Sequence, residues 1–349
     1  MKCTIQNIAD HLGLSRNTVS KALKNSSEVS ENTRNLVIKT ASKLGYKNAT
    51  FATPVIPASE TGSNGTILFL TRTYASDSEF WTTVLRGIES ILSNANYHLA
   101  ISIMSDSDLK QLNFPQTISD SSIKGIILVE ICDKVVCDAL SQFNLPIVSV
   151  DMPNVPFEEL NGIDVVTMES KKNLKKIINQ LIEKGAESFG FVGDLYSPNV
   201  SRGFQERYNA LSECLAEHQL PLNQKNCLLH QTPEDFRNFQ TTVNNLQAMI
   251  SLPDVFICGN DWTAIQLIYA LQFLGFQIPK DICVVGFDNI PAASRISPSL
   301  TTISTPQKYL GIAAARQLLE RIQHPNCPHV FCQYETELII RNSTNITSF

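Results

Sequence analysis

The chain of 349 residues lacks the short motifs by which many enzymes hold a nucleotide or an acyl group. It contains no Gly-x-Gly-x-x-Gly, no Gly-x-x-x-x-Gly-Lys-Ser/Thr and no Gly-x-Ser-x-Gly. The phosphate-binding loops of dinucleotide and P-loop proteins and the nucleophile elbow of α/β hydrolases are therefore missing. None of the six histidines ends an apolar run beside a nucleophile. We expect no catalytic residues, no cofactor and no enzyme activity.

Paired cysteines and long apolar runs are also missing. The nine cysteines form no Cys-x-x-Cys, and no histidine lies at zinc-finger spacing, so no metal site is expected. Scattered thiols in apolar runs are typical of a reducing compartment. No apolar run approaches the length of a membrane span, and the opening MKCTIQNIADHLG is too polar for a secretion signal. These absences predict a cytoplasmic protein without a membrane partner.

Acidic residues are scarce only near the N-terminus. Residues 1–50 carry eight Lys or Arg against three Asp or Glu, whereas the rest of the chain carries 20 basic and 30 acidic residues. The net charge of −5 therefore combines a basic head with an acidic body. This asymmetry predicts a polyanionic partner for the head alone. The length exceeds what one hydrophobic core usually supports, so several domains are expected.

Three short helical patterns fill the head. Thr4 can cap the first helix, which must stop at Gly13, while Ser15 can cap a second helix and Ser30 a third that ends at Gly45. Two short helices around a glycine-containing turn, braced by a third, are typical of a helix-turn-helix. The apolar residues at helical spacing are Ile5, Ile8, Ala9, Leu12, Val19, Ala22, Leu23, Val37, Ile38, Ala41 and Leu44.

The second helix of such a motif enters the major groove of DNA with its first residues facing the base edges. Arg16 suits guanine and Asn17 suits adenine, while Thr18, Ser20 and Lys24 suit phosphate. A small helical bundle with a solvated basic face is the alternative. The coincidence of the basic residues with the start of the second helix favours DNA binding.

Residues 4–46 resemble the DNA-binding head of the lactose-repressor (LacI) family of bacterial transcription regulators. The VS pair after the turn, the VSENTR opening of the third helix and the closing LGY carry the resemblance. It implies that Arg16, Asn17 and Lys21 read operator bases. The expected DNA-contacting residues are Thr4, Ser15, Arg16, Asn17, Thr18, Ser20, Lys21, Lys24 and Asn32.

Residues 48–64 form an unusual connector for this family. They contain Pro54 and Pro57 and lack the Ala-Arg-x-Leu-like run that forms the family's hinge helix. Because two prolines three residues apart oppose a continuous helix, we expect a semi-extended linker.

From Thr66 onward, apolar runs such as TILFL, GIILVEI and ICVVGFD alternate with amphipathic stretches. This alternation predicts parallel sheets that are covered on both faces. Ligands of such sheets bind beyond the carboxyl ends of the strands, where several runs of this chain end in polar residues. The polar strand ends are Asp151, Asp194, Asn260, Asp261, Asp288 and Asn289. Without an obvious base and nucleophile, they favour binding of hydroxyl groups over catalysis.

The body also resembles the LacI family, through SEFWTTVLRGIES, SRGFQERYNAL, VFICGNDWTAI and ICVVGFDNIPAASRISPSLTTIS. The expected fold is an all-α helix-turn-helix head followed by an α/β periplasmic-binding-protein-like type I body of two Rossmann-like lobes. The expected domains are a head at 1–47, a linker at 48–64, an effector-binding domain at 65–342 and a tail at 343–349. Its N-lobe takes about 65–161 and 292–322, and its C-lobe about 162–291 and 323–342.

The resemblance implies effector contacts by Phe80, Glu169, Arg207, Asn260 and Asp288. An ionised carboxylate that accepts hydrogen bonds and a guanidinium that donates them can hold adjacent sugar hydroxyls, while an aromatic ring covers the apolar sugar face. The same groups suit a nucleoside, so the ligand stays open. For individual residues, Asp288 as a helix cap, Arg207 as a surface charge and Trp81 as core are the alternatives.

These features predict a sequence-specific DNA-binding transcriptional regulator, a repressor, whose operator affinity is controlled by a sugar bound between the lobes. Its expected partners are pseudo-palindromic operator DNA, the sugar effector and a second copy in a homodimer, because two-fold operators mirror two-fold proteins. Two alternatives are a solute-binding protein that makes no use of its head and an α/β enzyme regulated through its head. The enzyme would need a catalytic pair that the chain does not display.

Overall fold

The computed structural model describes residues 4–23, 29, 30, 33, 34, 36, 37, 40, 41, 63–72, 78–195, 201–230 and 238–346. The chain divides into two compact units, Met1–Gly62 and Ser63–Phe349. Lys24, Asn32 and most of the predicted linker lie outside the described residues. Within those residues, no helix is both long enough and apolar enough to cross a membrane.

The first unit begins with two short helices, α1 (Ile5–Leu12) and α2 (Arg16–Leu23). The Thr4 hydroxyl accepts a hydrogen bond from the Asn7 amide, the Asn7 side chain accepts one from the Thr4 amide, and Gly13 ends α1 at φ 65°. The Ser15 hydroxyl accepts from the Thr18 amide at 3.0 Å at the start of α2. These contacts confirm the predicted caps, because each one satisfies a backbone group that a helix end leaves without a partner.

A small hydrophobic core holds the first unit together. It joins α1 and α2 to described residues of the following segment, in which residues 33, 34, 36, 37, 40 and 41 are helical. The Ser30 hydroxyl accepts from the Thr33 amide at 3.3 Å, as expected for the cap of a third helix. The buried members of this core are Ile8, Ala9, Val19, Ala22, Val29, Val37 and Ala41.

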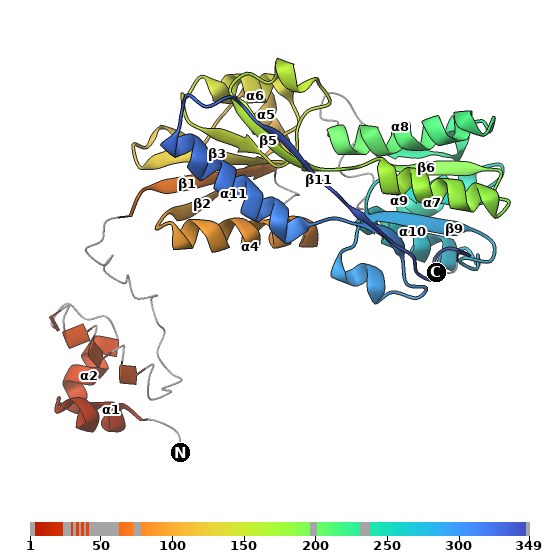
Figure 1. The fold of residues 1–349 in the computed structure, drawn as a ribbon. Helices are drawn as coiled ribbons and strands as arrows, with labels where there is room; N and C mark the ends of the chain where they lie inside the picture. The colour runs from red at the N-terminus through yellow and green to blue at the C-terminus, as the bar shows by residue number, and fades with distance from the viewer. Residues whose placement is uncertain are drawn as a thin grey trace. The chain divides into compact units, whose positions relative to one another are not determined.

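The second unit contains two six-stranded sheets (Figure 1). The first, in the order β11-β5-β4-β3-β1-β2, is parallel throughout. The second, in the order β12-β10-β9-β8-β6-β7, is parallel except for β12. The strands are β1 (Thr66–Arg72), β2 (His98–Met104), β3 (Ile123–Val129), β4 (Ile147–Ser149), β5 (Ile163–Met168), β6 (Phe189–Asp194), β7 (Leu228–His230), β8 (Val255–Cys258), β9 (Cys283–Asp288), β10 (Thr301–Ser304), β11 (Phe331–Tyr334) and β12 (Glu337–Ile339).

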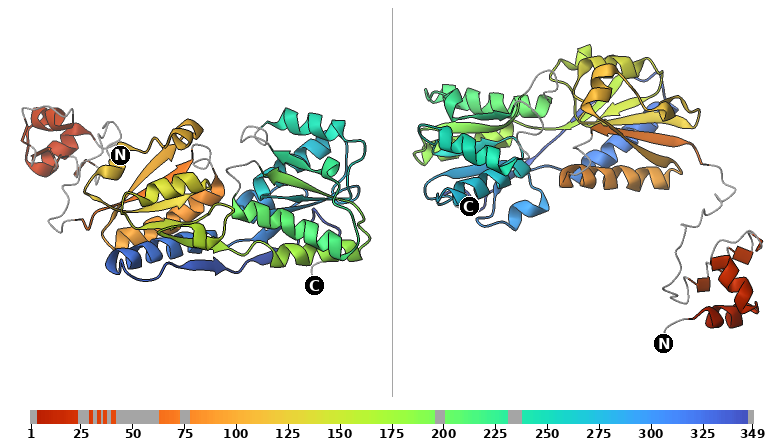
Figure 2. Two further views of the ribbon diagram at one scale, coloured as in Figure 1. Left: turned by 90° about the horizontal axis from the view of Figure 1, so that it is seen from above. Right: turned by 180° about the vertical axis from the view of Figure 1, so that it is seen from behind.

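Helices cover both faces of each sheet, and we call each sheet with its helices a lobe (Figure 2). The first lobe has α4 (Glu79–Asn94), α5 (Asp106–Gln111), α6 (Lys134–Ser141) and α11 (Gln307–Gln323). The second has α7 (Lys172–Glu183), α8 (Arg202–Glu217), α9 (Phe239–Ala248) and α10 (Asp261–Phe273). Along β1, Ile67 and Phe69 join the hydrophobic cluster of α4 and α11, whereas Leu68 and Leu70 join that of α5 and α6. Burial on both faces explains the continuous apolar runs of the strands.

Helices α4 and α11 approach each other closely on one face of the first sheet. A Cβ atom added at Gly87 would collide with the Lys308 carbonyl oxygen, and one added at Gly311 would collide with the Val84 carbonyl oxygen. Glycine at these two positions therefore lets the helix backbones touch, which makes α4 and α11 a tightly packed pair.

The chain crosses between the lobes three times, once after each of the strands β5, β10 and β11. Each crossing was predicted before the strand instead of after it. The predicted lobe boundaries at 161/162, 291/292 and 322/323 were wrong by one strand each. Strand β5 pairs with β4, and β11 pairs with β5, so both belong to the first lobe, whereas β10 pairs with β9 in the second. The periodicity of an apolar run identifies a buried strand but not the neighbour with which it pairs.

A buried ion pair stabilises the first lobe where α11 leads into β11. Asp164 is fully buried, and Arg321 contacts its two carboxylate oxygens at 3.0 and 2.9 Å. The Val330 amide and the Gln317 side chain also donate to this carboxylate. Burial alone raises the pKa of Asp164, but hydrogen bonds from Arg321, Gln317 and Val330 outweigh it and lower the pKa.

The variant Arg321→Ala would leave the Asp164 carboxylate buried without its cation. We expect a loss of about 3–5 kcal/mol in the free energy of unfolding, the usual effect of breaking a buried pair. Both tryptophans, Trp81 and Trp262, lie in the second unit, so urea unfolding followed by tryptophan fluorescence reports on that unit. The control Arg316→Ala, at an exposed position of α11, should change the free energy of unfolding by less than about 0.5 kcal/mol. Equal effects of the two variants would contradict this role of the pair.

Candidate functional site

One candidate site is the outer face of α2 in the first unit. Arg16 and Asn17, in its first turn, are exposed, while Val19 and Ala22 are fully buried against α1. Helix α2 therefore presents to solvent two of the three side chains that are predicted to read bases, Arg16 and Asn17.

The other predicted DNA contacts of α1 and α2 lie around this face. Ser20 and Lys21 are half-buried, and Thr4 and Ser15 are exposed. The hydroxyls of Ser15 and Thr18 lie 2.7 Å apart, so these two side chains also fix the start of α2.

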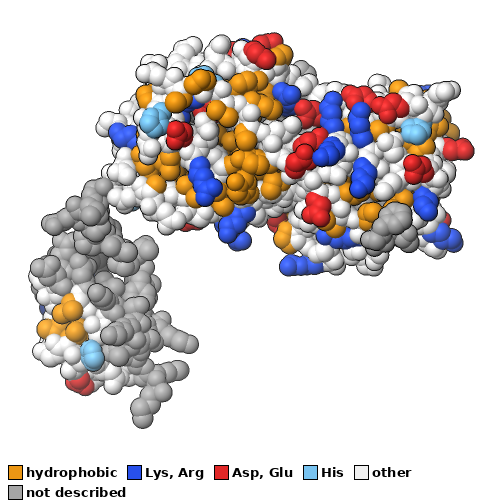
Figure 3. Space-filling model, in the orientation of Figure 1, with side chains coloured by type: hydrophobic (Ala, Val, Ile, Leu, Met, Phe, Trp, Pro, Cys, Tyr) orange, Lys and Arg blue, Asp and Glu red, His pale blue; other side chains and the backbone are white. Residues whose placement is uncertain are grey.

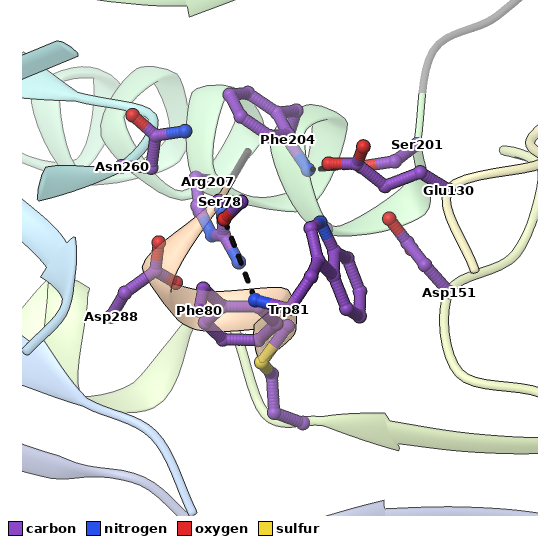
Figure 4. Close-up of a pocket in the computed structure, with 12 residues that line it drawn as sticks. Ser78, Phe80, Trp81, Glu130, Asp151, Ser201, Phe204, Arg207, Asn260 and Asp288 are labelled. Carbon is purple, nitrogen blue, oxygen red and sulfur yellow. Dashed lines mark hydrogen bonds between the residues drawn. The ribbon is translucent and has the colours of Figure 1, made fainter. Parts of the chain in front are cut away.

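A second candidate site lies where the carboxyl ends of strands from both lobes meet (Figure 4). Residues at or just after the ends of β3, β4, β5, β8 and β9 surround a cavity of about 50 Å³. This is the edge at which parallel sheets bind ligands. The lining residues are Ser78, Phe80, Trp81, Glu130, Asp151, Met168, Ser201, Gly203, Phe204, Arg207, Asn260 and Asp288.

The two lobes touch beside this cavity. The Arg202 amide of the second lobe donates to the Met152 carbonyl oxygen of the first at 3.0 Å, and Pro153 forms a β-bridge with Ser201. Ligand pockets typically enclose about 300–1,000 Å³. The cavity in this conformation is therefore too small for a typical ligand, which would need its walls to move apart.

Arg207 of α8 provides the positive charge of the cavity. Its side chain is 3% exposed, its Nη1 atom donates to the Gly259 carbonyl oxygen at 2.6 Å, and its guanidinium lies 3.6 Å from the centroid of the Phe287 ring. The Nε atom has no hydrogen-bond partner among the described residues. Burial lowers the pKa of Arg207, whereas Asp288 and Asp151 raise it. The alternative of a surface charge is wrong, because this side chain is buried beside the cavity.

Asp288 faces Arg207 from the end of β9 (Figure 4). Burial raises its pKa well above the usual value, and the charge of Arg207 acts in the opposite direction. The backbone of Asp288 has φ 121°, and its carbonyl oxygen accepts from the Gln307 side chain at 2.7 Å and from the Thr305 hydroxyl at 3.1 Å. Such backbone strain costs about 1–3 kcal/mol and clusters at binding sites.

Asp261 holds the loop that follows Asp288. Its fully buried carboxylate accepts from the Thr302 hydroxyl at 2.5 Å and from the Ile290 amide at 2.9 Å. Ile290 rather than Asp288 is the N-terminal cap of the short helix that follows, so the helix-cap alternative for Asp288 is wrong.

Two carboxyl groups of the first lobe line the cavity although neither was among the predicted effector contacts, and only Asp151 was named as a polar strand end. Glu130 follows β3, and its backbone has φ 54°. Burial raises the pKa of its carboxyl to about 7, and the charge of Asp151 adds a smaller increase. A hydrogen bond with Trp81 acts in the opposite direction. Asp151 follows β4, and burial raises its pKa to about 6 despite a hydrogen bond from the Met152 amide at 2.9 Å. The signal was present, because Glu130 also ends an apolar run, GIILVE.

The predicted effector residues divide into two groups. Phe80, Arg207, Asn260 and Asp288 line the cavity, and the Phe80 ring meets the Trp81 ring edge to face with centroids 4.6 Å apart. Trp81 is buried, with 7% of its surface exposed, and it also lines the cavity. It therefore belongs both to the hydrophobic core and to the wall of the site. Glu169 is not among the lining residues.

Two of these predicted residues have structural contacts. The Glu169 carboxylate accepts from the amides of Lys171 and Lys172 at 2.7 and 2.9 Å, and thereby fixes the start of α7. The Asn260 Oδ1 atom accepts from the Thr263 amide at 2.9 Å and caps α10, so its amide nitrogen is the atom that can donate to a ligand.

Together these residues form a site with acceptor carboxyls, one donor guanidinium and aromatic walls. This combination suits a compact polar ligand with several hydroxyl groups. In the part of the chain that the structure describes, no group of three or more His, Cys, Asp or Glu side chains could hold a metal ion.

The raised pKa of Glu130 predicts how stability depends on pH. Between pH 4.5, its ordinary pKa, and about 7, the folded protein retains a proton that the unfolded chain releases. Glu130 therefore contributes stability at low pH that is lost as the pH rises through this window. Glu130→Gln, which cannot ionise, should exceed the wild type in unfolding free energy by about 1–3 kcal/mol at pH 8 and match it near pH 5.

Urea unfolding at the two pH values measures this difference. Glu89→Gln, at an exposed position of α4, is the matched control and should show no pH-dependent gain. A Glu130→Gln variant that gains no stability at pH 8 would show that this carboxyl ionises without cost.

Two family models match this chain. Residues 4–48 match that of the bacterial regulatory proteins, lacI family, and residues 178–344 match that of the periplasmic binding protein-like domain. Together the two matches cover more than half of the chain.

Similar proteins align along nearly the whole sequence. The HTH-type transcriptional repressor PurR of Photobacterium profundum is 26% identical over 97% of this chain and 98% of its own. Catabolite control protein A of Staphylococcus xylosus is 28% identical over 94% of this chain and 97% of its own. A LacI family transcriptional regulator from Enterococcus faecium, solved with bound ribose, is 25% identical with a TM-score of 0.65, over 80% of this chain and 98% of that structure.

Proposed function

Because the chain belongs to the lacI family of bacterial regulatory proteins, we propose that it is a repressor whose operator affinity is set by a sugar bound between its two lobes. The chain is a DNA-binding transcriptional regulator and not an enzyme. The observation that carries the sugar assignment is the cavity in which Arg207 and three carboxyl groups face a compact space walled by aromatic rings.

A sugar suits this cavity chemically. Each hydroxyl both donates and accepts, so neighbouring hydroxyls can donate to Asp151 or Asp288 and accept from Arg207. The Phe80, Trp81 and Phe204 rings can cover the apolar face of the sugar ring. The ribose bound to the Enterococcus faecium relative supports this class of ligand.

The ligand would act by bridging the lobes. Glu130 and Asp151 belong to the first lobe and Arg207 and Asp288 to the second, so a ligand that contacts both favours the closed form. The Gln307 side chain donates to the Asp288 carbonyl oxygen, and Gln307 begins α11 of the first lobe. Movement at Asp288 therefore reaches the first lobe through a direct hydrogen bond.

We propose that the protein acts as a homodimer that pairs through the first lobe. Strand β2 is an edge strand whose Ile101 and Ile103 side chains are 53% and 47% exposed. Figure 3 shows further hydrophobic side chains gathered on the face of this lobe that carries α4 and α11. An exposed apolar edge strand promotes association, and a two-fold dimer matches a two-fold operator.

In this proposal the head, residues 1–47, contacts DNA through the residues predicted from the sequence, including Lys24 and Asn32. Residues 48–64 link it to the effector-binding body that begins at 65. The predicted start of the tail at 343 was wrong, because Ser343 is fully buried in the second lobe and its hydroxyl donates to the Val284 carbonyl oxygen at 2.6 Å. The protein acts in the cytoplasm, where operator DNA is accessible.

Loss of a base-reading side chain should weaken operator binding selectively. Arg16→Ala and Asn17→Ala should each cost about 1–3 kcal/mol per half-site, with a much smaller loss on random DNA. Fluorescence anisotropy with both DNAs measures the difference. Arg295→Ala removes one positive charge from an exposed position in the body and should change neither affinity. Equal losses on operator and random DNA would contradict base reading by these side chains.

Asp288→Asn should remove the response to ligand without changing operator affinity in the absence of ligand. The neutral amide keeps the size of the side chain, but its weaker hydrogen bonds should cost about 1.5–3 kcal/mol of ligand affinity. Operator affinity without ligand should stay at the wild-type value, since Asp288 lies in the body.

A thermal-shift panel of pentoses and hexoses, followed by operator binding with each hit, measures this effect. Asp281→Asn, at an exposed position of the second lobe, is the control. A variant Asp288→Asn that binds and responds to the hit like the wild type would place the ligand elsewhere.

A further inference from the structure

The cavity between the lobes contains more acidic than basic groups. Among the described residues, its lining includes Glu130, Asp151 and Asp288 but only one cationic side chain, Arg207. Arg207 already donates to the Gly259 carbonyl oxygen, and it is shared between Asp288 and Asp151. The nearby Arg72 is paired with Asp106 at 2.7 Å. The protein thus supplies less positive charge at this site than the carboxyl groups require.

Glu130 is a carboxyl of this cavity whose hydrogen bonds are incomplete. The side chain of Trp81 hydrogen-bonds to it, yet its buried Oε2 atom has no hydrogen-bond partner among the described residues. The charges that act on it are those of Asp151, Asp194 and Arg72, and two of these three are negative. A buried carboxylate is costly unless a cation or several donors balance it.

The hydrogen bonds of the Arg207 guanidinium are incomplete as well. Its Nε atom is buried and has no hydrogen-bond partner within the described part of the chain. Glu130 on the first lobe and Arg207 on the second both line the cavity, and each has a polar atom without a hydrogen-bond partner among the described residues. A ligand that fits both must itself carry a strong donor and an acceptor.

We propose that the ligand of this cavity is a polyhydroxylated molecule with a positively charged nitrogen, of the class of an amino sugar, whose ammonium group lies at Glu130 and Asp151. This inference rests on the proposed function and makes its ligand more specific. An ammonium group brings three donors and a charge opposite to that of the two carboxylates. The hydroxyl groups on the other side of the ligand meet Arg207 and Asp288.

The same charge balance discriminates against other sugars. A neutral sugar can donate to Glu130 but leaves its charge uncompensated when the carboxyl is ionised. A uronate or a phosphorylated sugar would bring a further negative charge to a cavity that already has three carboxyl groups. Like charges at close distance repel strongly in a buried site, so such ligands are rejected.

Isothermal titration of the full chain with matched sugars tests this inference. The probes are glucose, galactose and mannose, each with its 2-amino-2-deoxy analogue, and the uronates of glucose and galactose. We expect at least one amino sugar to bind about tenfold or more tightly than its neutral analogue, and the uronates not to bind. The same ligands are added to an operator-binding assay.

Glu130→Gln separates the charge effect from general binding. This variant should lose the preference for the amino sugar over its neutral analogue, and Asp151→Asn should reduce that preference as well. Glu89→Gln, at an exposed position of α4, should keep the wild-type ratio. A preference that survives in Glu130→Gln and Asp151→Asn would show that the ammonium group lies elsewhere.

The remaining outcomes distinguish this inference from the function on which it rests. A neutral or acidic sugar that binds as tightly as its amino analogue and shifts operator affinity would overturn the inference and leave the function intact. Absence of binding by every probe, or binding that leaves operator affinity unchanged, would count against both.

Discussion

The burial of Arg207 between the lobes is the constraint on which the proposed regulation depends. A guanidinium that is 3% exposed must be balanced within the protein, and its balancing charges come from Asp288 of its own lobe and Asp151 of the other. The electrostatic environment of one side chain therefore spans the cleft. Any ligand that hydrogen-bonds to these groups changes the free-energy difference between the open and closed forms, which is what a sensor requires.

The surrounding structure can carry such a change to the dimer surface. Three crossings of the chain join the lobes, and at one of them Gln307 ties the start of α11 to the backbone of Asp288. Helix α11 in turn packs directly on α4 where Gly87 and Gly311 let the two backbones touch. A tightly packed helix pair moves as a unit rather than absorbing displacement, because packed interiors are hard to compress. The cleft and the proposed pairing lobe are thereby physically continuous.

Much of this arrangement could be predicted from sequence, for identifiable reasons. The caps at Thr4, Ser15 and Gly13 depend on local chemistry, and the apolar runs of the strands report burial on both faces, so both were predictable. The lobe boundaries were not, because a strand's neighbours depend on long-range pairing that periodicity does not encode. Glu169 was assigned to the cavity by resemblance alone, and its carboxylate instead accepts hydrogen bonds from the Lys171 and Lys172 amides at the start of α7. Glu130 was missed although it ends an apolar run, whereas the groups that act on its carboxyl, including Trp81 and Asp194, come from distant parts of the chain.

The most direct test of the central claim, that the cleft ligand and the operator influence each other's binding, is a closed thermodynamic cycle on the full chain. The Kd for operator is measured with and without saturating ligand, and the Kd for the ligand is measured with and without saturating operator. The account predicts two equal ratios, each about 5- to 150-fold, because binding free energies around a cycle must close. Ratios of one on both sides would contradict it, since ligand and operator would then bind independently.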